Sequence, residues 1–239
     1  LKYSASQFIV RRGKETEIMA GYPWFGRWGR DTFIALPGVT LAAANDGRTC
    51  KEVLDTMIRQ LNNGLFPNIG KDKNASYNSV DAPMWFFKAV QEYGEAVQDD
   101  AAVWKSYGAK MKAVLKAYRD GINEYVKMVD NGLIWADEPG KALTWMDAIV
   151  NGVPVTPRGG YQVEINTKSY HDLGTFYPNG RYFPLLRGLG IRVQVNSDSH
   201  YPERINSGRP EALRALKQAG YETVMEMYNG VWQEMPIVL

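Results

Sequence analysis

Several segments of this sequence place a carboxylate close to a tryptophan, and these residue types together could do chemistry on a sugar. No histidine precedes His171 and the single cysteine is Cys50, so acid–base chemistry in the first 160 residues falls to carboxylates. The candidates are Trp28 with Arg30 and Asp31, Asp81 with Trp85, Asp137 with Glu138, and Trp145 with Asp147.

These residue types match the needs of a carbohydrate site. An indole face packs on the apolar C–H face of a sugar ring, while Asp and Arg side chains hydrogen-bond its hydroxyl groups. Cleavage of a glycosidic bond also needs a carboxylic acid that protonates the leaving oxygen and a second carboxylate opposite it. The alternative is that the tryptophans belong to the core and the aspartates cap helices, since both roles are common. The pattern alone leaves both interpretations open.

The elements expected to position these side chains are helical hairpins. Thr49-Cys50-Lys51-Glu52 has the pattern of a capping box and predicts a helix that ends at Gly64. Asp81-Ala82-Pro83 predicts the start of a second helix, and Asp99-Asp100 the start of a third. The carboxylate and tryptophan segments then fall in loops and at helix starts, as expected where helices form a scaffold for a site. Cys50 is expected to be a small buried hydrophobe.

From about residue 161 the hydrophobic period changes to two, which predicts a different fold. Strands are expected at 163–165, 191–195 and 223–227, and helices at 182–189 and from Pro210 to Gly220. This alternation predicts parallel βαβ units. We therefore expect a mainly α-helical part over residues 1–160 and an α/β segment over residues 161–239.

Several distinctive stretches follow one another over residues 7–166. They include Gln7-Phe8-Ile9-Val10, Trp28-Gly29-Arg30-Asp31, Gly64-Leu65-Phe66-Pro67-Asn68, Tyr77-Asn78-Ser79-Val80-Asp81 and Leu143-Thr144-Trp145-Met146-Asp147. With these stretches, residues 7–166 resemble the glucosidase domain of glycogen debranching enzymes, the amylo-α-1,6-glucosidase family. The resemblance implies a partial α/α toroid of the six-hairpin glycosidase type. It also implies inverting hydrolysis of α-1,6-linked glucose stubs in glycogen, with an α-glucan as partner and no cofactor.

The same resemblance implies roles for individual residues. Asp147 would be the general acid, and the general base of the family would lie beyond this stretch, so we expect an impaired enzyme. The residues expected to bind the sugar are Trp28, Arg30, Asp31, Asp81, Trp85, Trp145 and Glu164.

A second set of stretches includes Tyr177-Pro178-Asn179, Gly190-Ile191-Arg192-Val193 and Asn196-Ser197-Asp198-Ser199-His200. With these stretches, residues 161–239 resemble the C-terminal third of histidinol phosphatases of the metal-dependent polymerase-and-histidinol-phosphatase (PHP) family. The resemblance implies the last βα units of a distorted barrel, with Asp198 and His200 as ligands of Zn or Mn. Two ligands fall short of the three or four protein ligands of a usual transition-metal site, so we expect neither tight metal binding nor phosphatase activity. His171 is expected to cap or pack in a loop.

The two resemblances meet at Val163-Glu164-Ile165-Asn166, which suggests a chimera of two partial domains. The glucosidase is the preferred function. The alternatives are a histidinol-phosphate phosphatase, also incomplete, and a non-catalytic glucan-binding module.

Composition and charge limit the other function classes. The net charge is +2 and Lys and Arg form no stripe, so nucleic acid is not an expected partner. The stretch from Phe33 to Ala44 is too short to span a membrane and contains Pro37. A single cysteine is compatible with a reducing cytoplasm, which we take as the expected location. We interpret the start at Leu1 as a fragment boundary, and the sequence sets no oligomeric state.

Overall fold

The computed structural model describes a mainly α-helical chain with short antiparallel strand pairs. It describes residues 2–70, 72–130, 133–162, 165, 180–195, 206 and 208–239. The chain forms two compact units. The first contains residues 1–117 and 138–158, and the second contains residues 118–137 and 159–239.

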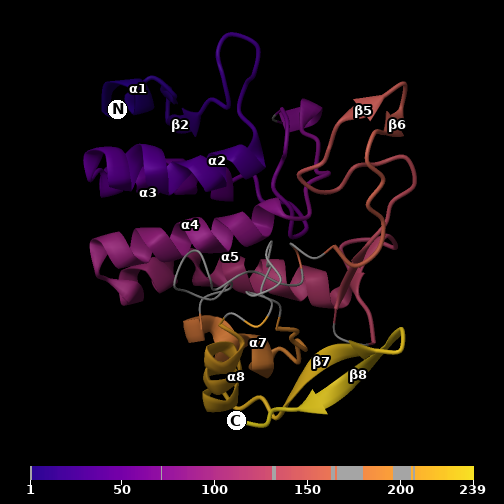
Figure 1. The fold of residues 1–239 in the computed structure, drawn as a ribbon. Helices are drawn as coiled ribbons and strands as arrows, with labels where there is room; N and C mark the ends of the chain where they lie inside the picture. The colour runs from indigo at the N-terminus through magenta and orange to yellow at the C-terminus, as the bar shows by residue number, and fades with distance from the viewer. Residues whose placement is uncertain are drawn as a thin grey trace. The chain divides into compact units, whose positions relative to one another are not determined.

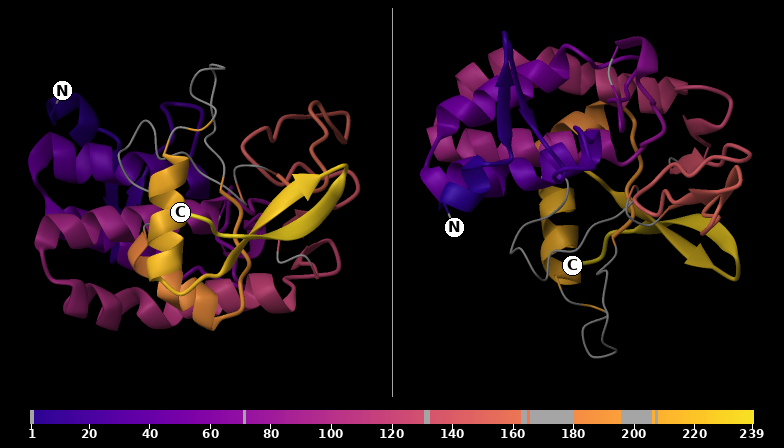
Figure 2. Two further views of the ribbon diagram at one scale, coloured as in Figure 1. Left: turned by 60° about the horizontal axis from the view of Figure 1, so that its bottom comes forward. Right: turned by 90° about the horizontal axis from the view of Figure 1, so that it is seen from above.

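Helices make up most of the first unit. In Figure 1, α2, α3 and α4 lie side by side, and the views of Figure 2 show the same arrangement. The last turn of α5 belongs to the second unit. The helices are α1 (Lys2–Ser6), α2 (Gly29–Leu36), the π-helix η1 (Pro37–Ala42), α3 (Gly47–Ile58), the short η2 (Asp72–Asn74), α4 (Ala82–Val97) and α5 (Asp100–Asp120).

The predicted starts of the second and third helices are confirmed, but the first helix begins earlier than its expected capping box. Asp46 is the N-cap of α3, and its carboxylate accepts from the Thr49 amide at 2.9 Å and from the Thr49 hydroxyl at 2.6 Å. Thr49 therefore lies inside the helix. Cys50 follows it and is fully buried, as expected of a small hydrophobe.

Three phenylalanine rings form the part of the core that joins α2 to α4. Phe33 lies on α2, Phe86 on α4 and Phe66 in the segment between α3 and α4. Their ring centroids are 4.8 Å apart for Phe33 and Phe66, 5.1 Å for Phe66 and Phe86, and 5.5 Å for Phe33 and Phe86. All three rings are essentially inaccessible to solvent. Because each lies a few residues from a polar group of the site described below, this cluster fixes the distances between those groups.

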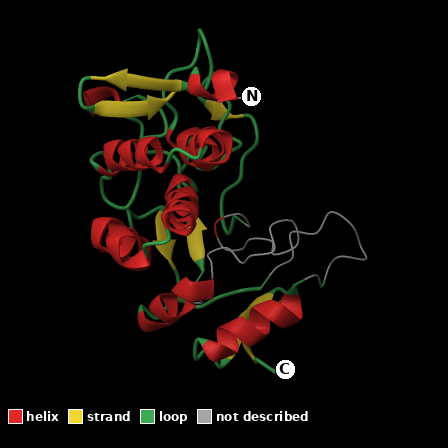
Figure 3. Cartoon of the chain, turned by 90° about the vertical axis from the view of Figure 1, so that its left-hand side faces the viewer, coloured by secondary structure: helices red, strands yellow, loops and turns green. Residues whose placement is uncertain are grey.

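Two small hairpins complete the first unit. β1 (Ile9–Arg12) pairs with β2 (Glu15–Ile18), and β2 packs against α3. Figure 3 shows this strand pair next to the helices of the unit. β5 (Ile149–Val150) pairs with β6 (Val153–Pro154) directly after Asp147. Asn151 and Gly152, with φ of 51° and 77°, form the turn. Positive φ at both positions is what a two-residue hairpin turn of this hand requires.

The second unit does not contain the expected parallel βαβ arrangement among its described residues. Residues 191–195 form no strand, and all named strand pairs are antiparallel. The expected strand at 223–227 exists, but it pairs with the strand that follows it, because Asn229-Gly230 makes a tight turn. The predicted helices at 182–189 and 210–220 are confirmed within a few residues. The elements are β3 (Val126–Met128), β4 (Ile134–Ala136), η3 (Gly180–Tyr182), α7 (Phe183–Gly188), α8 (Arg209–Gln218), β7 (Thr223–Tyr228) and β8 (Val231–Pro236).

Within the described part of the chain, no helix has both the length and the apolar character needed to cross a bilayer.

Candidate active site

The first unit brings together a cluster of polar side chains with Arg30 at its centre. The Arg30 guanidinium donates from Nε to Asp81 Oδ2 at 2.7 Å and from Nη1 to Asp147 Oδ2 at 2.9 Å. Its third nitrogen, Nη2, donates to the Ser79 hydroxyl at 3.1 Å. Only 7% of the Arg30 side chain is exposed, so these charge-assisted bonds form largely out of water. Two carboxylates that are distant in sequence are thereby held on one guanidinium.

Local structure explains why Arg30 reaches this position. It lies in the first turn of α2, and the amide of Gly29 just before it donates to Asn68 O at 2.9 Å. A Cβ on Gly29 would lie 2.3 Å from Pro67 O, so only glycine allows the two backbones to approach this closely.

The segment that carries Asp147 is held against the same region by hydrogen bonds to its main-chain oxygens. The Val80 amide donates to Leu143 O at 2.8 Å, and Asn78 Nδ2 donates to Ala142 O at 3.3 Å. Asp147 follows a few residues later. Its Oδ2 atom accepts from Asn68 Nδ2 at 3.1 Å in addition to Arg30. The Asp147 side chain is 19% exposed, so it is the carboxylate of the Arg30 pairs that solvent or a ligand can reach.

The Asp81 side chain accepts hydrogen bonds from the cluster and does not cap the helix that it precedes. It is the N-cap residue of α4, but its side chain makes no capping bond. Its Oδ1 instead accepts from the Ser79 hydroxyl at 2.5 Å while Oδ2 accepts from Arg30. With both oxygens engaged and 2% of the residue exposed, Asp81 is a structural counter-ion for Arg30.

Charge and burial shift the ionisation of two residues here. Burial by itself lowers the pKa of Arg30, but the hydrogen bonds and charges of Asp81 and Asp147 outweigh it and raise the pKa overall. Desolvation raises the pKa of Asp31, the nearby Arg30 charge opposes this, and the negative charges of Asp147 and Asp81 add to the rise. Arg30 therefore stays cationic, and Asp31 holds a proton to higher pH than an ordinary aspartate.

The tryptophans expected at the site differ in exposure. Trp28 is half-buried at the N-cap of α2 and packs edge-on against Phe25 with ring centroids 6.0 Å apart. Trp145 is 55% exposed, with the Arg158 guanidinium 6.0 Å from its ring centre. Trp85 is half-buried in the first turn of α4. The sequence interpretation did not select Trp24, whose side chain is 85% exposed in the loop before Trp28.

Asn68 and Ser79 also belong to the cluster and were missed as site residues. Both are uncharged and fully buried, and each lies in a stretch that carries the family resemblance. Of the residues expected at functional positions, Glu164, Asp198 and His200 lie outside the described residues, as does His171. Among the residues that the structure does describe, no three His, Cys, Asp or Glu side chains are placed to hold a metal ion.

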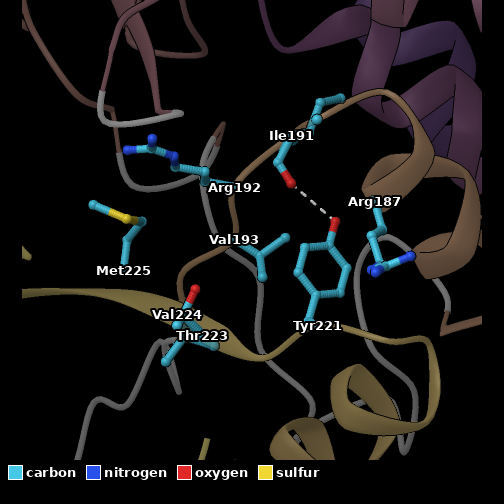
Figure 4. Close-up of a pocket in the computed structure, with 9 residues that line it drawn as sticks. Arg187, Ile191, Arg192, Val193, Tyr221, Thr223, Val224 and Met225 are labelled. Carbon is cyan, nitrogen blue, oxygen red and sulfur yellow. Dashed lines mark hydrogen bonds between the residues drawn. The ribbon is translucent and has the colours of Figure 1, made fainter. Parts of the chain in front are cut away.

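The second unit has a pocket of about 170 Å³ at the start of β7, near the end of α7. Figure 4 shows Arg187 beside Tyr221, whose hydroxyl donates to Ile191 O at 2.9 Å. Burial raises the pKa of Tyr221, partly opposed by the charge of Arg187, so the phenol remains a donor. The described lining contains no carboxylate, histidine or cysteine. It therefore lacks the acid–base groups that the Arg30 cluster has.

The close approach at Gly29 gives a testable consequence. Gly29→Ala is expected to lower the free energy of unfolding by about 1–3 kcal/mol, because the added methyl group would force the Pro67 backbone away. Gly26→Ala is the matched control, since a Cβ there meets no atom within 4 Å. Urea denaturation of both variants measures the difference. Equal stability of the two variants would contradict the packing described for Gly29.

Comparison with known proteins places the chain in a family. A family model described as amylo-alpha-1,6-glucosidase matches residues 3–181, and the chain therefore belongs to this family. The chain is also similar to the glycogen debranching enzyme of Saccharomyces cerevisiae, at 26% identity over 227 residues. That alignment covers 66% of this chain and 15% of the yeast protein, so the chain spans a small part of its relative. The family match extends past residue 160, into the segment where a second resemblance was expected.

Proposed function

We propose that this chain supplies part of the active site of a glycogen-debranching α-1,6-glucosidase, with Asp147 as the general acid. The observation that carries the proposal is the partly exposed Asp147 carboxylate, which Arg30 and Asn68 hold two residues after the exposed Trp145. Membership of the family supports the reaction class. The substrate we propose is an α-glucan carrying a single α-1,6-linked glucose.

The proposed roles of the other residues follow from their exposure. Trp28 and Asp31 contact the terminal glucose, and Arg30 orients the carboxylates around it. Asp81 acts on the sugar only through Arg30. Trp85 lines the cleft that we propose holds this glucose. We also propose that Glu164 contacts the leaving sugar and that the helices form part of an α/α toroid.

The second carboxylate that inversion requires comes from elsewhere in the proposed enzyme. A base must activate a water on the opposite face of the sugar. Asp81 is unsuited to this, because both of its oxygens already accept hydrogen bonds inside the cluster. We therefore propose that the chain by itself binds α-glucan weakly and turns it over slowly or not at all. Carboxylate chemistry of this kind needs no cofactor, and any Zn or Mn at Asp198 and His200 is proposed to bind weakly.

A glucan-binding module without catalysis is the second candidate, and the exposed indoles favour it. Trp24 and Trp145 present 85% and 55% of their surface to solvent, so their indole faces are available to pack on the C–H face of a sugar ring. The release of glucose distinguishes the two candidates, because a binding module retains the glucan without cleaving it.

Glucose release from glycogen limit dextrin tests the proposal. The complete gene product that carries this sequence is expected to release glucose, and the isolated chain is expected to be retained on immobilised glycogen with little or no release. Trp145→Ala should weaken that retention, whereas Trp104→Ala, at an exposed tryptophan of α5, should not. Retention without glucose release by the complete gene product would reject the glucosidase in favour of the binding module. Efficient release by the isolated chain would show that the chain holds a complete catalytic pair.

A further inference from the structure

Asn68 joins the two segments on which the proposed acid depends. Its main-chain oxygen accepts from Gly29 N at 2.9 Å and its amide donates to Ser76 O at 2.7 Å. Its side-chain Nδ2 donates to Asp147 Oδ2 at 3.1 Å. The residue has no exposed surface. Backbone and side chain together thus tie the start of α2 to the carboxylate of Asp147.

The contacts of Asp147 are unequal on its two oxygens. Oδ2 accepts from both Arg30 and Asn68, whereas no described residue donates to Oδ1. An oxygen that already accepts two hydrogen bonds is a poor place for a proton, because its lone pairs are engaged. When the carboxyl group is neutral, its proton therefore resides on Oδ1.

Asn68 bears on Asp147 more selectively than Arg30 does. Arg30 divides its donors among Asp147, Asp81 and Ser79, so it also stabilises the fold of the cluster. The described side-chain contact of Asn68 is to Asp147 alone. The charged groups around this carboxylate are Arg30, Asp81 and Asp31, and the neutral amide adds a donor without changing the charge balance among them.

The orientation of the Asn68 amide is set by this contact. Its Oδ1 atom is buried with no hydrogen-bond partner among the described residues. Rotating the amide by 180° would place its Oδ1 atom next to Asp147 Oδ2. Both atoms are acceptors, so they would repel each other and form no hydrogen bond. The bond from Nδ2 to the carboxylate therefore sets the orientation of the amide.

We propose that Asn68 is a positioning residue that, with Arg30, fixes Asp147 so that its transferable proton sits on Oδ1. The role of Asn68 in proton transfer rests on the function proposed above. Its hydrogen bond to the Asp147 carboxylate does not depend on that function. Asn68 acts through Asp147 and does not touch the substrate. It contributes a neutral donor that stabilises the ionised form of the acid after the proton has left.

Carbon-13 NMR of the aspartate carboxyl groups in this chain tests the hold on Asp147. The Asp147 resonance is assigned by its loss in Asp147→Asn. Removing the donor to Oδ2 should shift the Asp147 carboxyl resonance in Asn68→Leu, because that carbon reports the hydrogen bonds that its oxygens accept. Asn78→Leu is the matched control, because Asn78 donates to the Ala142 carbonyl of the same segment. Asn68→Ser, which is too short to reach the carboxylate, should shift the resonance in the same direction if the leucine variant does not fold. An unchanged Asp147 resonance in the folded Asn68 variants would overturn the proposal.

Rates of hydrolysis by the complete gene product, measured on two substrates, distinguish a positioning role of Asn68 from a loss of structure in the variant. For an α-1,6-linked glucoside, Asn68→Leu should lower kcat at least tenfold while KM stays within about threefold. For a dinitrophenyl α-glucoside, whose leaving group needs no proton, the rate should be nearly unchanged. Equal losses on both substrates would overturn the positioning role. A shifted Asp147 resonance with no hydrolysis by the wild type would instead reject the glucosidase function and leave Asn68 as the group that holds this carboxylate.

Discussion

Replacing Arg30 with glutamine is expected to lower the free energy of unfolding by about 3–5 kcal/mol, because it leaves buried negative charge without a partner. The Arg30 and Asp81 side chains are only 7% and 3% exposed. Glutamine supplies a donor but no charge, and the two carboxylates would then face each other uncompensated. Urea denaturation followed by circular dichroism measures the effect.

Two comparisons show whether this loss comes from the buried ion pairs. Arg48→Gln removes an arginine that is 89% exposed and pairs with Glu52 on the helix surface, so its expected cost is at most about 1 kcal/mol. Adding Asp81→Asn to Arg30→Gln should restore part of the stability, because it removes one of the unpaired charges. A single Arg30 variant as stable as the Arg48 variant would mean that the cluster is not a buried charge network.

Asp147→Asn is expected to lower the rate of α-1,6-glucoside hydrolysis by the complete gene product about 10²- to 10⁴-fold, the usual contribution of a general acid. Asparagine has nearly the same shape and still offers an oxygen to Arg30, so stability should change little. KM should stay within a few-fold because the substituted group acts mainly in the transition state. Initial rates of glucose release give both constants.

The leaving group distinguishes acid catalysis from substrate binding at this position. A dinitrophenolate leaves without protonation, so the Asp147→Asn variant should hydrolyse the dinitrophenyl α-glucoside at close to the wild-type rate. If both substrates slow equally, Asp147 serves binding or structure and another group is the acid. Asp31 would then be the next carboxyl to test, since burial and the nearby negative charges raise its pKa despite the opposing charge of Arg30.

The helices of the first unit could be predicted because their signals are local. Asp81-Ala82-Pro83 and Asp99-Asp100 mark helix starts that the structure confirms. The start of α3 was placed wrongly, since Asp46 and Thr49 are both good capping residues three positions apart. The carboxylate of Asp46 reaches the Thr49 amide and hydroxyl, and this additional contact decides the competition.

The site was predicted in its charged members but not in its neutral ones. Arg30, Asp81 and Asp147 were selected because charge next to tryptophan suggests sugar chemistry, and the structure brings these three together. Asn68 reaches Asp147 across 79 positions of sequence, and nothing local marks such a contact. Ser79 likewise acts through neighbours that only the folded chain supplies.

The fold of the second unit could not be predicted from alternation of hydrophobic residues alone. Residues 191–195 alternate as a strand would, but a strand also needs a partner along its length. Within the described residues, β7 takes β8 as its partner through the Asn229-Gly230 turn. The contact between Met225 N and Val193 O, at 2.8 Å, is a single bond and not a ladder. The Asn-Gly pair was the local signal that favoured a hairpin over a βαβ unit.

A crystal structure of the complete gene product with an α-1,6-linked diglucoside, its bridging oxygen replaced by sulfur, would test the central claim most directly. The sulfur is predicted to lie about 3–3.5 Å from Asp147 Oδ1, while Oδ2 keeps its bonds to Arg30 and Asn68. A ligand bound away from Asp147, or one that meets this carboxylate through Oδ2 after the Arg30 bond has broken, would contradict the assignment of Asp147 as the acid.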